Sequence, residues 1–134
     1  MYKGRGRKIY REISLGKSII GKNRCIDVFA IHEESHKALA VECKYQATAG
    51  TVDEKISYAL ADLEALWIPG CVVYAGEGFS IGVVHMLRGS KRAAYCLPDA
   101  SLVANANTRE LDHIVASLFG WWDVILGGKQ PVSI

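Results

Sequence analysis

The sequence contains no long apolar segment. Its purely apolar runs are short, such as residues 71–75, whereas a helix that crosses a membrane needs roughly 20 apolar residues. The basic N-terminal stretch is not followed by an apolar one, which excludes the usual pattern of a secretory signal. We therefore expect a cytoplasmic protein that has no membrane partner.

Motifs for zinc and for nucleotides are also absent. The four cysteines are far apart in the sequence and form no CxxC pattern. Cys25, Cys43 and Cys71 lie within strand-like apolar runs and are predicted to be small core residues of a reduced protein. Gly16-Lys17-Ser18 resembles the end of a phosphate-binding loop, but Arg11 stands where that loop requires its first glycine. No nucleotide cofactor is expected.

The net charge is only +2, but the charges are unevenly distributed. Residues 1–24 hold eight basic side chains and one acid, Glu12, whereas the other 110 residues hold eight basic and thirteen acidic side chains. A basic arm on a mildly acidic body favours a polyanion partner, and a solvated, frayed terminus is the alternative. The basic residues are Lys3 and Arg11, together with the candidate DNA-binding residues Arg5, Arg7, Lys8, Lys17, Lys22 and Arg24.

The order of the predicted elements indicates a single α/β domain over residues 1–134. Half of the residues are hydrophobic, which is enough for a core. The first three strands should form an antiparallel meander, and the fourth should return through a right-handed crossover to give a mixed sheet flanked by helices. The strands are predicted at 8–15, 24–32, 37–46, 71–75 and 92–97, and the helices from residue 51, at 79–87 and at 108–126.

The helix that begins near residue 51 is a candidate for phosphate binding. Thr51 is predicted to be its N-cap, and Glu54 completes a capping box. The free N–H groups at the start of a helix attract phosphate, and Lys55 and Tyr58 could face the same cleft. An ordinary capped helix, with Tyr58 partly in the core, is the alternative.

The hairpin formed by the second and third predicted strands brings charged residues together. Its turn is predicted as a two-residue loop centred on Glu34-Ser35, so opposed residues have numbers that add up to 69. This register places Asp27 opposite Glu42, with Cβ atoms about 5 Å apart. Lys44 shares the Glu42 face of the strand, whereas Cys43 points the other way, into the core.

Two carboxylates that face each other across a hairpin repel and destabilise it. A divalent cation between Asp27 and Glu42 removes this repulsion, and oxygen ligands without cysteine or histidine favour Mg²⁺ or Mn²⁺ over zinc. Such a metal polarises a phosphodiester and lowers the pKa of a bound water, and a neighbouring lysine stabilises the developing phosphate charge. An exposed strand held by salt bridges is the alternative.

Asp27, followed by a short hairpin and Glu42-Cys43-Lys44, matches a D…ExK motif. Over roughly residues 8–97 the chain resembles the PD-(D/E)XK nuclease superfamily, which includes many restriction endonucleases, Holliday-junction resolvases and RecB-type nucleases. The resemblance implies a restriction-endonuclease-like α/β fold, with a mixed central β-sheet flanked by helices. It also implies that Asp27 and Glu42 bind metal with the Cys43 backbone carbonyl, that Lys44 is the catalytic lysine, and that Gln46 is an active-site accessory.

The N-terminal part departs from the pattern of that superfamily. Ile26, not proline, precedes Asp27, and many members of the superfamily also lack this proline. The superfamily usually begins with a helix that often adds a glutamate to the metal site, whereas the residues before Asp27 are predicted to be basic strand and turn. Glu12 is the only acid among them. Glu12 could fill this role, a partner subunit could supply the element, or the site is incomplete.

The resemblance predicts a metal-dependent endonuclease that hydrolyses DNA phosphodiester bonds with Mg²⁺ or Mn²⁺. A catalytically inactive subunit of the same fold, which binds DNA or serves in assembly, is the alternative. Trp121 and Trp122 are adjacent on the last predicted helix and cannot both face one core. Because a small nuclease that cuts two strands often dimerises, we expect one of these tryptophans to meet a partner chain in a homodimer.

Overall fold

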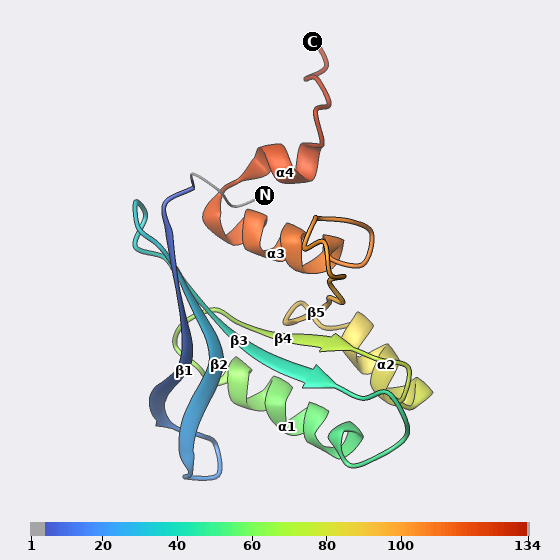
Figure 1. Cartoon of the computed structure of the whole chain (residues 1–134). Helices are drawn as coiled ribbons and strands as arrows, with labels where there is room; N and C mark the ends of the chain where they lie inside the picture. The colour runs from blue at the N-terminus through green and yellow to red at the C-terminus, as the bar shows by residue number, and fades with distance from the viewer. Residues whose placement is uncertain (1–4, 134) are drawn as a thin grey trace.

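The computed structural model describes residues 5–133, so Lys3 of the predicted basic arm lies outside the described part (Figure 1). One five-stranded sheet has the order β1-β2-β3-β4-β5, antiparallel up to β3 and parallel from β3 to β5. This confirms the predicted mixed sheet with flanking helices. The elements are β1 (Arg7–Lys17), β2 (Asn23–His32), β3 (Ala38–Tyr45), α1 (Val52–Glu64), β4 (Gly70–Ala75), α2 (Ile81–Arg88), β5 (Ala93–Tyr95), α3 (Arg109–Phe119) and α4 (Trp122–Leu126).

The sheet is covered on both faces, with α1 and α3 on opposite sides of it (Figure 1). Neighbouring residues of β3 alternate between the two cores, as strand geometry requires. Ala40 packs with Ile56 of α1, whereas Val41 packs with Phe119 of α3. Within residues 5–133, no helix has the length and apolar character needed to span a membrane.

The hairpin of β2 and β3 has the predicted register. Val28 pairs with Val41 and Ile31 with Ala38, so the residue numbers of each pair add up to 69. The predicted two-residue loop is wrong, because the His32 N–H donates to the Lys37 carbonyl at 2.9 Å and closes a four-residue turn. The longer turn has the same centre, which is why the register is unchanged.

The sheet divides at Asp27. The pairing of β2 with β3 ends at Val28, while β2 stays paired with β1 and β3 stays paired with β4. Ile26 packs in the α1-side core and Val28 packs against the α3-side core, although residues two apart on a regular strand share one face. On β1, Glu12 lies between the paired residues Arg11 and Ile13 and has a positive φ of 55°. The β1–β2 ribbon therefore turns over at this point and separates from β3.

The predicted C-terminal helix is interrupted. Gly120 adopts a left-handed conformation, φ 75°, and ends α3, so that α4 begins anew at Trp122. Trp121 is buried and packs against Phe119, whereas Trp122 is 55% exposed. The prediction that only one tryptophan faces the core is confirmed.

Two of the three cysteines predicted to lie in the core do not lie there. Cys71 is buried, and its burial raises the pKa of the thiol to about 12. Cys25 and Cys43 are exposed, because they lie beyond Val28 and Val41, where the strands have separated. Cys43 instead lines an apolar cavity of about 220 Å³ beneath α3.

A buried ion pair fixes the separated ribbon to α1. The Arg24 guanidinium donates two hydrogen bonds of 2.8 Å to the Asp62 carboxylate, and side-chain exposures are 8% and 11%. Asp62 also accepts a hydrogen bond from the Ile19 N–H at 3.0 Å, and Arg24 donates to the Leu15 carbonyl at 3.2 Å. Arg24 is one of the candidate DNA-binding residues, and its guanidinium is committed to this buried pair.

Replacement of Asp62 by Asn should lower the free energy of unfolding by about 3 kcal/mol, because it leaves the Arg24 charge buried without its partner. Arg24 also lowers the pKa of Asp62. The pair therefore stabilises the fold fully above the usual aspartate pKa of about 3.9, and this stabilisation is lost as the pH falls through the lowered pKa of the folded state. Urea unfolding of both proteins across acidic pH measures both effects.

The matched control is Glu64→Gln on the same helix. Glu64 pairs with Arg92, but its side chain is 61% exposed, so this change should cost less than about 1 kcal/mol. Equal losses for the two variants would contradict the structural role of the Arg24–Asp62 pair.

Candidate active site

The two motif carboxylates lie where β2 and β3 separate. Asp27 Oδ2 accepts a hydrogen bond of 2.8 Å from the Cys43 N–H. The carboxylate thus replaces the β2 backbone as the partner of this β3 N–H. The Asp27 charge lies near enough to Glu42 to raise the pKa of the Glu42 carboxyl. The carboxyl groups of Asp27 and Glu42 are thus held close together at the point where β2 and β3 separate, which we call the fork.

The Glu42 carboxylate is in an unfavourable environment. Its side chain is 18% exposed, and burial followed by the nearby Asp27 charge raises its pKa. Lys44 Nζ lies 3.7 Å from Glu42 Oε2 and opposes this rise. A cation bound between the carboxylates would stabilise both of them in their charged form.

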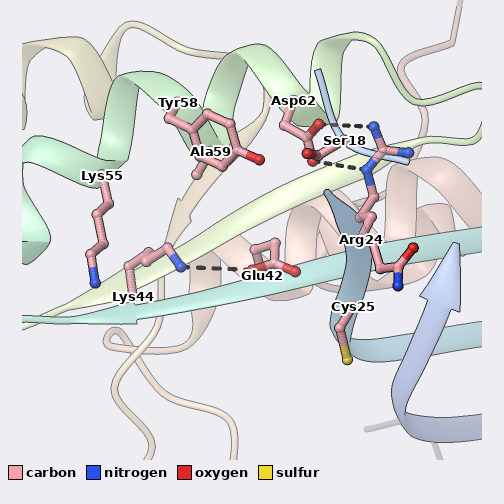
Figure 2. A pocket seen from close by; sticks show the side chains of 10 residues that line it. Ser18, Arg24, Cys25, Glu42, Lys44, Lys55, Tyr58, Ala59 and Asp62 are labelled. Atoms are coloured by element: carbon pink, nitrogen blue, oxygen red, sulfur yellow. Dashed lines mark hydrogen bonds and ion pairs between the residues drawn. The ribbon is translucent and has the colours of Figure 1, made fainter. Parts of the chain in front are cut away.

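A cavity of about 330 Å³ opens beside Glu42 and Lys44 (Figure 2). Figure 2 shows Lys55, Tyr58 and Asp62 reaching toward it from α1, opposite the strand that carries the motif. The separated ribbon closes the third side with Ser18 and three consecutive residues at the start of β2, namely Asn23, Arg24 and Cys25. Asp27 does not line this cavity, since its side chain turns to the β3 backbone.

Carboxylate and carbonyl oxygens form the donor set that fits Mg²⁺ or Mn²⁺. Asp27 and Glu42 bring two such carboxylates together at the fork. Within residues 5–133, no group of three or more His, Cys, Asp and Glu side chains is arranged to hold a metal ion. Glu12 is exposed and does not join Asp27 and Glu42 in such a group.

The predicted basic arm is mostly the edge strand β1. Arg5 pairs with Asp123 and stacks over Trp121 at 5.0 Å, and Arg7 lines the apolar cavity beneath α3. These two arginines lie on the α3 side, away from the cavity beside Glu42. Of the other candidate DNA-binding residues, Lys55 lines the cavity, Lys17 and Lys22 flank the turn between β1 and β2, and Lys8 is exposed on β1.

Gln46 holds two loops together. Its Oε1 accepts from the Asp53 N–H at 3.1 Å, and its Nε2 donates to the Gly78 carbonyl at 2.9 Å. It therefore caps α1 in place of Thr51, which has helical dihedrals and makes no side-chain cap, so the predicted capping box is wrong. A Cβ on Gly76 would lie 2.2 Å from the Gln46 carbonyl oxygen, so the two loops pack backbone against backbone.

Asn23 and Asp62 are cavity residues that the sequence did not reveal. Neither lies within the D…ExK motif, and Asp62 is 38 residues from its partner Arg24. The spacing of the α1 residues offered one signal. Lys55, Tyr58 and Asp62 are three or four residues apart and so share one helix face.

Replacement of Gln46 by Ala should cost about 2 kcal/mol of stability, because the Asp53 N–H and the Gly78 carbonyl lose their partner within a buried region. Urea unfolding measures this loss. Gln130→Ala near the C-terminus is the control and should have no effect, because Gln130 is exposed. An unchanged stability for Gln46→Ala would show that Gln46 is not a structural cap.

No curated protein matches the chain. A crystal structure described as a protein of unknown function, AF1548, aligns with a TM-score of 0.40 and 16% identity, and covers 62% of this chain and 45% of that one. This chain thus spans less than half the length of that protein. The model of the PD-(D/E)XK nuclease superfamily domain matches residues 1–122. The chain therefore belongs to the PD-(D/E)XK nuclease superfamily.

Proposed function

We propose that the protein is a metal-dependent endonuclease that hydrolyses DNA phosphodiester bonds. The observation that carries this proposal is the fork at Asp27, where two carboxylates approach each other and Lys44 accompanies Glu42 at 3.7 Å. Asp27, Glu42 and the Cys43 carbonyl would hold Mg²⁺ or Mn²⁺. The metal, when bound, would polarise the phosphodiester and lower the pKa of a water molecule.

The residues of the chain divide the remaining tasks. Lys44 would stabilise charge that develops on the phosphate, because its ammonium group lies beside Glu42, the proposed metal ligand. Lys55 lines the cavity from α1 and would hold a neighbouring phosphate of the same strand. Gln46 supports this arrangement indirectly, because it fixes the first turn of the helix that carries Lys55.

Asp27→Asn and Lys44→Ala should each lower the rate of DNA cleavage by a factor on the order of 100 to 1,000, the usual cost of losing an electrostatic group at a reacting phosphate. Cleavage of plasmid and branched DNA with Mg²⁺ or Mn²⁺ measures this rate, and EDTA should abolish it. Calorimetric titration of Mn²⁺ should show weaker binding to Asp27→Asn.

The controls are Lys37→Ala and Asp99→Asn. Both residues are exposed and lie outside the cavity, so both variants should cut at the parental rate. Cleavage by Asp27→Asn and Lys44→Ala at that same rate would show that the fork is not the active site.

A non-catalytic DNA-binding or assembly subunit is the second candidate. One observation favours it: the described residues place no third acidic side chain with Asp27 and Glu42. DNA binding that persists in EDTA, without cleavage under any metal condition, would support this candidate over the nuclease. A homodimer, in which a second copy completes the site, would appear as cleavage that rises with the square of protein concentration.

A further inference from the structure

The turn between β1 and β2 exposes two adjacent isoleucines. Ile19 is 50% exposed and Ile20 is 59% exposed, and both lie in the turn itself rather than on a strand face. Lys17 precedes this pair and Lys22 follows it. We call residues 17–23 the β1–β2 tip. Neither side chain belongs to either core, so both can contact a partner outside the fold.

The β1–β2 tip is held in place. The Ser18 N–H donates to the Lys22 carbonyl at 2.7 Å, and the Gly21 N–H donates to the Ser18 carbonyl at 2.9 Å. Gly21 has a φ of +77°, which suits glycine. The Ile19 N–H is bound to Asp62 of α1 at 3.0 Å. The tip is therefore a shaped projection, fixed on the helix that lines the candidate active site.

The β1–β2 tip also forms one wall of the active-site cavity. Ser18 and Asn23, which belong to it, line the same cavity as Glu42 and Lys44. A DNA strand with a phosphate at Glu42 and Lys44 must pass beside this wall. Ile19 and Ile20 do not line the cavity themselves, but they directly follow Ser18 and so lie next to this wall.

The chemistry of the β1–β2 tip indicates which feature of DNA it would contact. Its lysines suit phosphates on either side of a groove. Branched apolar side chains have no hydrogen-bonding function, but they do enter between base steps that have come apart. Separation of bases is easiest at a mismatch, a bulge or a branch point, where stacking is already weakened.

We propose that the β1–β2 tip is an apolar wedge, which inserts Ile19 and Ile20 at a weakened base step beside the phosphate to be cleaved. This inference rests on the proposed nuclease function and names its substrate class, namely DNA with interrupted stacking. The wedge gives the cleavage site a preference that the D…ExK residues cannot supply, since they contact only the sugar–phosphate backbone.

The test compares the parent with Ile19→Ser/Ile20→Ser on a branched duplex and on a continuous one. Both carry 2-aminopurine at the step beside the cleavage point, and Ca²⁺ replaces Mg²⁺ in the binding measurement. The parent should raise 2-aminopurine fluorescence on the branched DNA, and the double variant should not. With Mg²⁺, the preference for branched over continuous DNA should fall by about tenfold, the effect expected for losing contact with two partly buried apolar side chains.

Val103→Ser is the matched control, because Val103 is also apolar and 64% exposed but lies outside the β1–β2 tip. It should behave as the parent does. Ile20→Ser alone serves if the double variant is unstable, since the backbone anchor to Asp62 lies at residue 19. The single change should then reduce both the fluorescence response and the substrate preference.

Three outcomes would overturn the wedge. Parental fluorescence and preference in a folded variant would show that the isoleucines do not enter DNA. Loss of self-association in the variant, seen by sedimentation without a change in fluorescence, would assign the β1–β2 tip to contact between copies of the chain. A parent that neither binds nor cuts any DNA would overturn the proposed function as well, and so would be distinguished from failure of the wedge alone.

Discussion

The hydrogen bond from the Cys43 N–H to Asp27 is the contact on which the geometry of the candidate site depends. When β2 leaves β3, the backbone of β3 loses a neighbour on that side, and a backbone donor within a sheet needs a replacement partner. The Asp27 carboxylate supplies it at 2.8 Å. This contact stabilises the division of the sheet and brings Asp27 beside Glu42. The fork therefore creates both the candidate metal-binding site and the space for the cavity next to it.

The cavity persists because α1 is attached near both ends. Gln46 binds its first turn, and the Arg24–Asp62 pair binds its last turns to the separated ribbon. Between these attachments, one face of the helix presents Lys55 and Tyr58 toward Glu42 and Lys44 (Figure 2). Without the Arg24–Asp62 contact, nothing in the β-pairing would hold the ribbon against the helix, because β2 is paired only with β1 at that point.

The sequence predicted those features that depend on local pattern. The alternation of apolar and polar residues, together with the turn residues, was sufficient to predict the strand order and the register of β2 with β3. The predicted two-residue loop and the observed four-residue turn have the same centre, so both give the same pairing. The turning over of the β1–β2 ribbon at Glu12 and Asp27 was not predictable. The sequence prediction took both strands as regular, with alternate side chains on the same face throughout. Capping by Gln46 and the pairing of Arg24 with Asp62 were missed for another reason. Arg24 and Asp62 are 38 residues apart, and Gln46 reaches the Asp53 N–H from before the helix and the Gly78 carbonyl 32 residues away. No local signal distinguishes such a residue from an exposed one.

The two carboxylates that line the cavity, Asp62 and Glu42, differ in how well their charges are balanced by their neighbours, and this difference bears on function. Arg24 and Asp62 are opposite in charge, share two hydrogen bonds of 2.8 Å, and are almost fully buried. Glu42 has a like-charged neighbour and only a 3.7 Å contact with Lys44, so its pKa rises rather than falls. The fold thus gives the Asp62 carboxylate a partner of opposite charge and leaves the Glu42 carboxylate beside a group of like charge. Local conflicts of this kind concentrate at functional sites, where an interaction absent from the isolated chain resolves them. A structural salt bridge on an exposed strand would require no such conflict, whereas a site that gains a divalent cation does.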